Sequence, residues 1–369
     1  MTSGMEDIVA ADSAITWIDG THGELRYRGY PIEELAENLS FEAVAYLLWN
    51  GELPGREELD RLRHELDEVR VARADVINQV RQVPATAHPL DVLRVVVSSD
   101  ATTNPLTWDN TTDANRRKAI EFTAWFPTVV AAQHRLAAGQ EPLLPTPGLD
   151  TAAAFLTMLY GHDPSPQQVR TLDTSLILHA DHELNASTFA ARVTIATQSN
   201  LHAAIASALG TLSGPRHGGA SERVVAMLEE IGTPDNAESW TISRLTQKQR
   251  IMGFGHRVYR TVDPRSRQLR AMAERLLQGT PHQPWIAILD VVAEVMQREK
   301  NLYPNVDLYA ALVNHELGVQ PAFYSAVFAI SRITGWTAHA MEQLDGRMIR
   351  PTAQYIGPSL RHVPESVGV

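Results

Sequence analysis

The chain has 369 residues, of which 44% are hydrophobic and 20% charged, a balance typical of a folded globule rather than a disordered chain. Its net charge of −11 argues against nucleic acid or an anionic membrane as the main partner, and the absence of cysteine excludes disulfides, thiol nucleophiles and thiolate metal sites. No run approaches the roughly 20 apolar residues of a bilayer span, and the first residues lack the regions of a secretory signal, so a cytoplasmic location is expected.

The N-terminal part of the chain carries its only clear strand signal. Apolar and polar residues alternate around Asp19-Gly20 and His22-Gly23, which predicts a short β-hairpin before a helix that begins at Pro31. Helical spacing follows, and Ser40 is expected to cap a helix that ends at Gly51. Further helices are expected over residues 55–72, 115–137, 150–160 and 165–179.

The rest of the chain changes in charge along its length. Residues 186–213 are rich in Ala, Ser and Thr, as expected of helices that approach closely at the centre of a fold or at a subunit interface. After Gly214-Pro215 the helices are much more charged, and the chain turns apolar again over residues 321–345. We therefore expect a large domain formed by residues 1–218 and 319–369, with a small domain, residues 219–318, inserted in it.

A glycine-rich stretch carries the first candidate catalytic residue. His217 lies among three glycines, directly before a helix that should begin near Ser221. Glycines let a ligand approach the backbone, and a helix N-terminus disfavours cationic histidine, so a neutral imidazole here could donate a hydrogen bond to a carbonyl that becomes an enolate. The alternative is a surface turn that happens to contain a histidine.

The second candidate, His256, follows a glycine-flanked loop. The next helix is expected to open with Asp263 as N-cap, Pro264 and Arg265. Because a cation is disfavoured in the first helical turn, Arg265 is explained by an anion that its guanidinium and the free helix amides hold together, or it is an exposed arginine tolerated at small cost. With Arg257, Arg260 and Arg267, it forms the clearest basic cluster of the chain.

Two further histidines, His179 and His182, lie three positions apart and would share a helix face if the stretch is helical. The spacing is not the His-Glu-x-x-His of zinc hydrolases. It therefore favours histidines of the core or in contact with substrate, and no metal site is expected.

The C-terminal third adds one acid and two arginines. Asp307 lies at the start of a predicted helix, where an isolated aspartate is most often a simple cap. Arg332 stands inside an apolar run and needs partners, either the last carbonyls of its helix or a buried carboxylate ligand. Arg350 precedes a proline and is unremarkable by itself.

Six motifs occur in order along the chain, namely LRYRGYPIEELA, HADHELNASTF, GPRHGG, GFGHRVYRTVDPR, PNVDLY and IRPTAQY. In this order, and over nearly the whole chain, they resemble the citrate synthase family. The resemblance implies an all-α homodimer with a short N-terminal β-hairpin, a discontinuous large domain, a small inserted domain and an active site between them. It also implies an Si-type acyltransferase, which converts the acyl group into an alkyl group on transfer.

The resemblance implies a role for each candidate residue in the condensation of acetyl-CoA with oxaloacetate and water to citrate and CoA. Asp307 would remove a methyl proton, His217 would stabilise the enol, and His256 would polarise the ketone and protonate the alkoxide. The residues implied to hold oxaloacetate are His182, Arg265, Arg332 and, from the neighbouring subunit, Arg350. Its two carboxylates suit bidentate guanidinium partners.

Coenzyme A is assigned by the same resemblance to the backbone before His256 and to one basic residue. The positions are Ile251, Met252, Gly253, Phe254, Gly255 and Arg260. Thr352 stands where relatives commonly place Arg or Lys, which puts one phosphate contact in doubt. Acetyl-CoA is a co-substrate, no tightly bound cofactor is expected, and the short, cysteine-free chain favours the dimeric type over the NADH-regulated hexameric one.

Two other functions compete with this prediction. A 2-methylcitrate synthase would share every residue named above and use propionyl-CoA, and one methylene is worth only about 1–3 kcal/mol of discrimination. The His-Ala-Asp-His form at residues 179–182 favours acetyl-CoA, because propionyl-using relatives more often have Ala-Glu-His there. The second is a non-catalytic helical scaffold, against which the intact set of Asp307, His217 and His256 argues.

Overall fold

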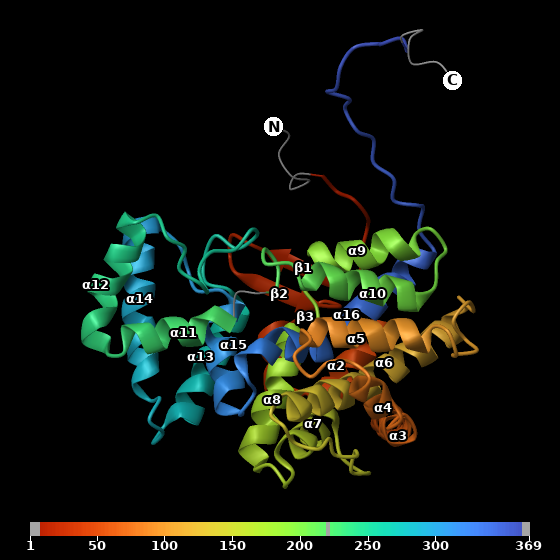
Figure 1. The fold of residues 1–369 in the computed structure, drawn as a ribbon, viewed down its shortest axis with the longest axis horizontal. Coiled ribbons are helices and arrows are strands. Elements are labelled where there is room, and N and C mark those ends of the chain that lie inside the picture. The colour runs from red at the N-terminus through yellow and green to blue at the C-terminus, as the bar shows by residue number, and fades with distance from the viewer. Residues whose placement is uncertain (1–7, 219–221, 364–369) are drawn as a thin grey trace.

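The structure is a computed structural model that describes residues 8–218 and 222–363. The described chain is built from α-helices and one small sheet, which confirms the expected all-α class with a short N-terminal β element (Figure 1). The strands are β1 (Thr16–Asp19), β2 (Glu24–Tyr27) and β3 (Tyr30–Pro31). The helices are α1 (Ile32–Asn38), α2 (Phe41–Asn50), α3 (Arg56–Ala72), α4 (Val76–Arg81), α5 (Pro89–Asp100), α6 (Thr112–Ala137), α7 (Thr151–Tyr160), α8 (Pro166–His179), α9 (Ala186–Ile195), α10 (Leu201–Leu212), α11 (Glu222–Ile231), α12 (Pro234–Thr246), α13 (Pro264–Leu277), α14 (Pro284–Lys300), α15 (Val306–Glu316), the short 3-10 helix η1 (Pro321–Phe323) and α16 (Tyr324–Leu344).

The N-terminal sheet has one strand more than expected. β1 and β2 form the predicted antiparallel hairpin, and β3 pairs with β2 through Tyr27 and Tyr30. Arg28 and Gly29 make the tight turn between them with φ values of 50° and 91°. Because Pro31 belongs to this third strand and serves as the N-cap, the first helix starts at Ile32 instead of Pro31.

Local capping explains why several helix boundaries agree with the sequence. The Ser40 side chain accepts the backbone N–H of Ala43, and Gly51 ends α2 in the left-handed conformation with φ 89°. Four helices, α4, α5, α12 and α14, were not delimited from the sequence. Three of these, α5, α12 and α14, begin with a proline. In a sequence, a proline can indicate either the first residue of a helix or a break between two helices.

Helix α16 lies at the centre of the molecule and contacts α2, α5, α6, α8, α9 and α10 (Figure 1). Its residues from Ile330 to Ala340 are all buried, as expected of a helix surrounded by others. Helices α11 to α15 pack on one another at one side of this core. The predicted domain boundary at residue 219 and the helix start near Ser221 fall on residues 219–221, outside the described residues.

In the described part of the chain, no helix is both long and apolar enough to cross a bilayer.

Candidate active site

Two buried arginines, Arg265 of α13 and Arg332 of α16, mark the candidate site, with exposed fractions of 2% and 1%. Both act electrostatically on the pKa of His182, and one or the other acts on the pKa of each predicted catalytic residue. Residues far apart in the sequence are therefore brought together around these two charges.

Arg265 finds an anion within the protein. Its Nε donates to Oδ1 of Asp263 at 3.0 Å and its Nη2 donates to Oδ2 at 2.7 Å, while the same carboxylate caps α13. Burial opposes the charge of Arg265, but Asp263 outweighs it and raises the arginine pKa. An exposed arginine is thus the wrong explanation, and the charge at this helix start is balanced by Asp263. Within the described residues Nη1 makes no hydrogen bond.

Arg332 does not bond to the last carbonyl groups of its own helix, which were one of the two partners considered from the sequence. Its Nε donates to the carbonyl oxygen of His179, at the end of α8 and 2.7 Å away, and its guanidinium lies 4.5 Å from the ring centre of Phe328. Burial lowers the pKa of Arg332 to about 10, so it stays charged at neutral pH. No carboxylate of the described residues forms an ion pair with it, which leaves Nη1 and Nη2 suited to an anionic ligand.

His182 and His256 meet beside these arginines, with ring centres 5.1 Å apart. Tyr259 packs against both rings, and its hydroxyl lies 3.3 Å from Nε2 of His182. Burial, followed by the charge of Arg265, lowers the pKa of His182 well below its ordinary value and that of His256 to about 4. Both rings are therefore neutral at pH 7.

The backbone fixes the tautomer of His256. Its Nδ1 accepts the N–H of Val258 at 3.0 Å and that of Tyr259 at 3.2 Å. A neutral imidazole carries one proton, so the proton of His256 must be on Nε2. The side chain can donate that hydrogen to an oxygen of a ligand.

His217 is held in the opposite tautomer. Its Nε2 accepts the backbone N–H of Ser187 at 3.3 Å, which requires an unprotonated Nε2. The Ser187 hydroxyl lies 2.8 Å from Nε2, accepts from Trp336 at 3.1 Å and donates to Oδ1 of Asn185 at 2.8 Å. Burial and the charge of Arg332 lower the pKa of His217 to about 4. The proton of this neutral ring is therefore on Nδ1, which is left to donate to a ligand, and a plain surface turn does not describe the residue.

Asp307 is the second residue of α15, and it does not cap that helix. Asn305 is the N-cap, and its side chain accepts the backbone N–H of Asp307 at 3.1 Å. Among the described residues no hydrogen bond reaches the Asp307 carboxylate. Burial raises its pKa to about 6, although the nearby Arg265 lowers it. This is the pKa of a group that can accept a proton near neutral pH.

His179 and His182 do not share a helix face, because α8 ends at His179 and His182 belongs to the following loop. His179 is buried, its pKa falls to about 3, and its Nδ1 donates to the Ser175 carbonyl oxygen at 2.7 Å. Arg265 and Arg332 also act on the pKa of His179, and His179 and Asp307 line the same small cavity, so both histidines lie at the candidate site.

The backbone assigned to coenzyme A is tied to the start of α15. Gly255 N–H donates to the Tyr303 carbonyl oxygen, and Asn305 N–H donates to that of Gly253, both at 2.9 Å. Gly253 has φ 81°, and a Cβ there would lie 3.0 Å from the Cα of Leu308. A glycine at 253 thus lets this backbone lie directly against the helix that carries Asp307.

The hairpin between β1 and β2 packs on the loop that follows His256. Arg260 N–H donates to the Gly20 carbonyl oxygen at 2.8 Å, and a Cβ on Gly20 would lie 2.7 Å from the carbonyl carbon of Val258. The hairpin predicted from the sequence thus supports the loop that carries a site histidine.

Two of the predicted binding residues have exposed side chains. The Arg260 side chain is exposed, and Arg350 is exposed in the chain that leaves α16 and extends away from the body of the molecule (Figure 1). The role predicted for Arg350 in a neighbouring subunit stays a prediction.

Three positioning residues were missed by sequence reasoning. Tyr259 packs on two histidines, Ser187 fixes the tautomer of His217, and Asn305 caps the helix of Asp307. Asn305 could have been found, since an asparagine just before an apolar helical run is a typical N-cap. The other two depend on contacts between distant segments, which the sequence pattern does not reveal.

Together these groups form an acid-base site for an anionic carbonyl compound. It offers one carboxylate with a pKa of about 6, the neutral imidazoles of His182, His217 and His256, and two buried guanidinium groups. The rings of His217 and His256 carry their protons on opposite nitrogens. Such a set can remove a weakly acidic proton and stabilise the oxyanion that results.

Comparison with known proteins gives a consistent result. Residues 4–352 match the family model "Citrate synthase, C-terminal domain". The chain is 43% identical to citrate synthase 2 of Bacillus subtilis, over 97% of this chain and 96% of that protein, and 39% identical to 2-methylcitrate synthase of Mycobacterium tuberculosis, over 98% and 92%. The solved ternary complex of Thermoplasma acidophilum citrate synthase with carboxymethyl coenzyme A and oxaloacetate is similar in fold, with a TM-score of 0.92, 33% identity and 98% of each chain covered.

Proposed function

Since the chain belongs to the citrate synthase family, we propose that it condenses acetyl-CoA with oxaloacetate and water to give citrate and CoA. The observation that carries this proposal is the buried Arg332, which acts on neutral His182 and His217 and forms no ion pair within the described chain, where Asp181 acts on it only through its charge. A dianionic keto acid supplies both the missing negative charge and a carbonyl group for the histidines.

Oxaloacetate would bind between the arginines and the paired histidines. Nη1 and Nη2 of Arg332 and Nη1 of Arg265 are the nitrogens left to its carboxylates. His182 and His256 lie beside Arg265, where the Nε2–H of His256 would donate to the ketone oxygen. Neutral imidazoles suit this task, because the charge of the nearby Arg265 disfavours a further buried cation.

Carbon–carbon bond formation would begin at Asp307. Its carboxylate takes a proton from the acetyl-CoA methyl group, the C–H electron pair forms the carbon–carbon double bond, and the thioester carbonyl pair moves to its oxygen, which Nδ1–H of His217 stabilises as the enol oxygen. The thioester C=O then re-forms as the enol carbon attacks the ketone carbon. The ketone electron pair moves to its oxygen, which takes the proton from Nε2 of His256, and the proton held by Asp307 is given up afterwards so that His256 can be reprotonated. Water hydrolyses the resulting citryl-CoA to citrate and CoA.

The remaining assignments belong to the same proposal. Coenzyme A would lie along residues 251–255, with Arg260 as a basic contact. The protein would act as a cytoplasmic homodimer in which Arg350 completes the oxaloacetate site of the neighbouring subunit. Closure of residues 219–318 on the large domain would exclude water until citryl-CoA has formed.

Replacement of Arg332 tests the oxaloacetate site. We expect Arg332→Met to weaken oxaloacetate binding by about 1.5–3 kcal/mol, because a charged hydrogen-bonding partner of the ligand is removed. Isothermal calorimetry with oxaloacetate measures the change. Arg70→Met is the matched control, since Arg70 is equally buried but bonds to the Leu149 carbonyl oxygen. Equal affinities in wild type and Arg332→Met would remove Arg332 from the site.

An assay of CoA release with two acyl donors tests the reaction itself. We expect a higher kcat/KM with acetyl-CoA than with propionyl-CoA at saturating oxaloacetate. The reverse order would identify a 2-methylcitrate synthase, the activity named for the Mycobacterium tuberculosis relative. Release from neither donor would leave the fold with a non-catalytic role and contradict the proposal.

A further inference from the structure

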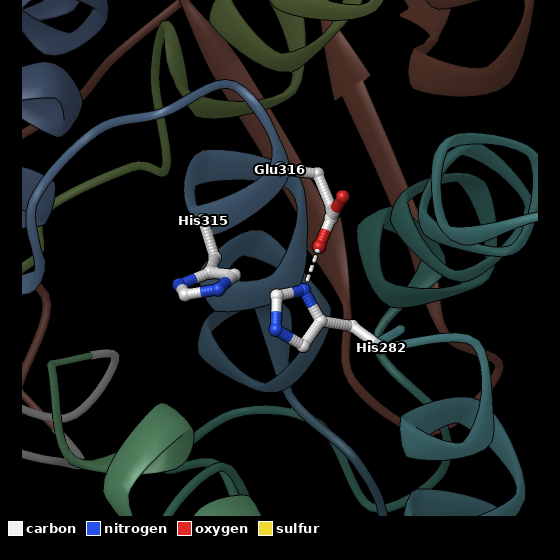
Figure 2. A group of neighbouring side chains, drawn as sticks. All are labelled: His282, His315 and Glu316. Atoms are coloured by element: carbon white, nitrogen blue, oxygen red, sulfur yellow. Dashed lines mark hydrogen bonds and ion pairs between the residues drawn. The ribbon is translucent and has the colours of Figure 1, made fainter. Parts of the chain in front are cut away.

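A second group of histidines lies outside the candidate active site. His282 precedes α14, while His315 and Glu316 end α15 (Figure 2). Each offers one nitrogen or oxygen ligand atom, and these atoms lie within 4.8 Å of one another. Nδ1 of His282 donates to Oε1 of Glu316 at 2.6 Å, and the imidazole rings of His282 and His315 meet edge to face with centres 4.7 Å apart. His282 and Glu316 are 34 positions apart, so no sequence spacing announces the group.

The surroundings hold the two imidazoles in place without sealing them in. Trp285 stacks on His282 with ring centres 4.2 Å apart and contacts His315 at 5.0 Å. The backbone N–H of His282 donates to the Thr280 hydroxyl at 3.2 Å. The His282 side chain keeps 36% of its exposure, so an ion could reach the group from solvent.

We propose that His282, His315 and Glu316 bind a divalent transition-metal ion of the zinc type. Two imidazoles with one carboxylate favour Zn²⁺, Co²⁺ or Ni²⁺ over Mg²⁺ or Ca²⁺, which prefer oxygen ligands alone. Tetrahedral zinc with bonds of roughly 2.0–2.1 Å places its ligand atoms about 3.3 Å apart. Side-chain rotation must therefore close the widest separation by about 1.5 Å, and coordination replaces the hydrogen bond between His282 and Glu316.

The charge around the group suits a cation. Besides His282, the carboxylates of Glu316 and of Glu229 in α11 act electrostatically on His315. A divalent ion would balance both acidic groups.

The metal group lies at the far ends of two helices that carry active-site residues. Helices α13 and α15 pack side by side, and Arg265 and Asp307, at their first turns, interact with each other. His315 lies eight residues beyond Asp307, or about 12 Å along α15, and His282 follows the end of α13. A bound ion would thus link the two helices at the ends opposite the candidate site.

Metal titration of the full chain tests this proposal independently of enzymatic activity. The protein is freed of metal with a chelator and titrated with ZnCl₂ in a calorimeter. We expect one ion per chain, and His282→Gln and His315→Gln should each weaken binding roughly tenfold or more because each removes a ligand. Zn²⁺ should raise the Tm of the wild type and not of these variants.

His64→Gln is the matched control, because His64 pairs with Glu68 at 3.1 Å on α3 but has no third ligand. It should bind Zn²⁺ like the wild type. Circular dichroism melting without metal shows whether each variant is folded, and the Co²⁺ absorption spectrum of the wild type reports nitrogen ligation without any substitution. Wild-type affinity in both His282→Gln and His315→Gln, or a Co²⁺ spectrum of the hydrated ion, would overturn the proposal.

Discussion

Asp307→Ala should lower kcat for CoA release by about 10²–10⁴-fold with little change in oxaloacetate affinity. A thioester α-proton is very weakly acidic, and Asp307 is the carboxylate whose pKa, about 6, suits it to remove that proton. Asp307→Asn should lose as much activity, because the amide keeps the size of the side chain and cannot accept the proton. Steady-state CoA release and oxaloacetate calorimetry measure the two effects separately.

The pH dependence provides an independent readout for the same residue. Below its pKa of about 6 Asp307 is protonated and cannot act as a base, so kcat/KM should rise with pH through that value. His217 and His256, with pKa values of about 4, stay neutral over the same range and should add no limb there. The matched control is Asp235→Asn, since Asp235 is the exposed second residue of α12 just as Asp307 is the second residue of α15. Unchanged turnover in Asp307→Ala would refute the assignment and favour the non-catalytic scaffold.

His217→Ala should lower kcat by about 10²–10³-fold, the typical effect of removing one donor to a developing oxyanion. Ser187→Ala should cost less, because the backbone N–H of Ser187 remains to hold Nε2 of His217 as an acceptor. The order of activity should therefore be wild type, Ser187→Ala and then His217→Ala, measured as CoA release at saturating substrates.

His162→Ala is a suitable control for the histidine substitution, because His162 is exposed at the end of α7. It should keep wild-type turnover. If His217→Ala also kept it, another group would have to stabilise the enol.

Local interactions explain which parts of the fold the sequence predicts. The cap at Ser40 and the stop at Gly51 act within one helical turn, so the residues themselves determine where α2 begins and ends. The third strand was missed because its pairing depends on a left-handed turn at Arg28, a residue type that gives no turn signal. Helices α5, α12 and α14 were not delimited for another reason: the proline that begins each of them equally marks a break between helices.

For the candidate site, too, local sequence signals were predictive and contacts between distant segments were not. The glycine-rich loops and the ordered motifs identify His217, His256 and Asp307, because these signals are contiguous in the sequence. The protonated nitrogen of each histidine could not be predicted, because Ser187 lies 30 positions from His217 and their contact exists only in the folded chain. The ion pair between Arg265 and Asp263 was also not predicted, although the two residues are only two positions apart. An aspartate that caps a helix and also pairs with an arginine has the same sequence pattern as an aspartate that only caps it.

Arg350 lies in the exposed chain after α16, and its predicted role in the neighbouring site would have a consequence for the genetics of the protein. If Arg350 serves the neighbouring site, a chain lacking Asp307 and a chain lacking Arg350 are both inactive alone. In a mixed dimer, however, the site with an intact Asp307 receives an intact Arg350 from the other chain. Two defective alleles would then restore one complete site in each mixed dimer. The recovered activity would depend on the fraction of chains that form mixed dimers.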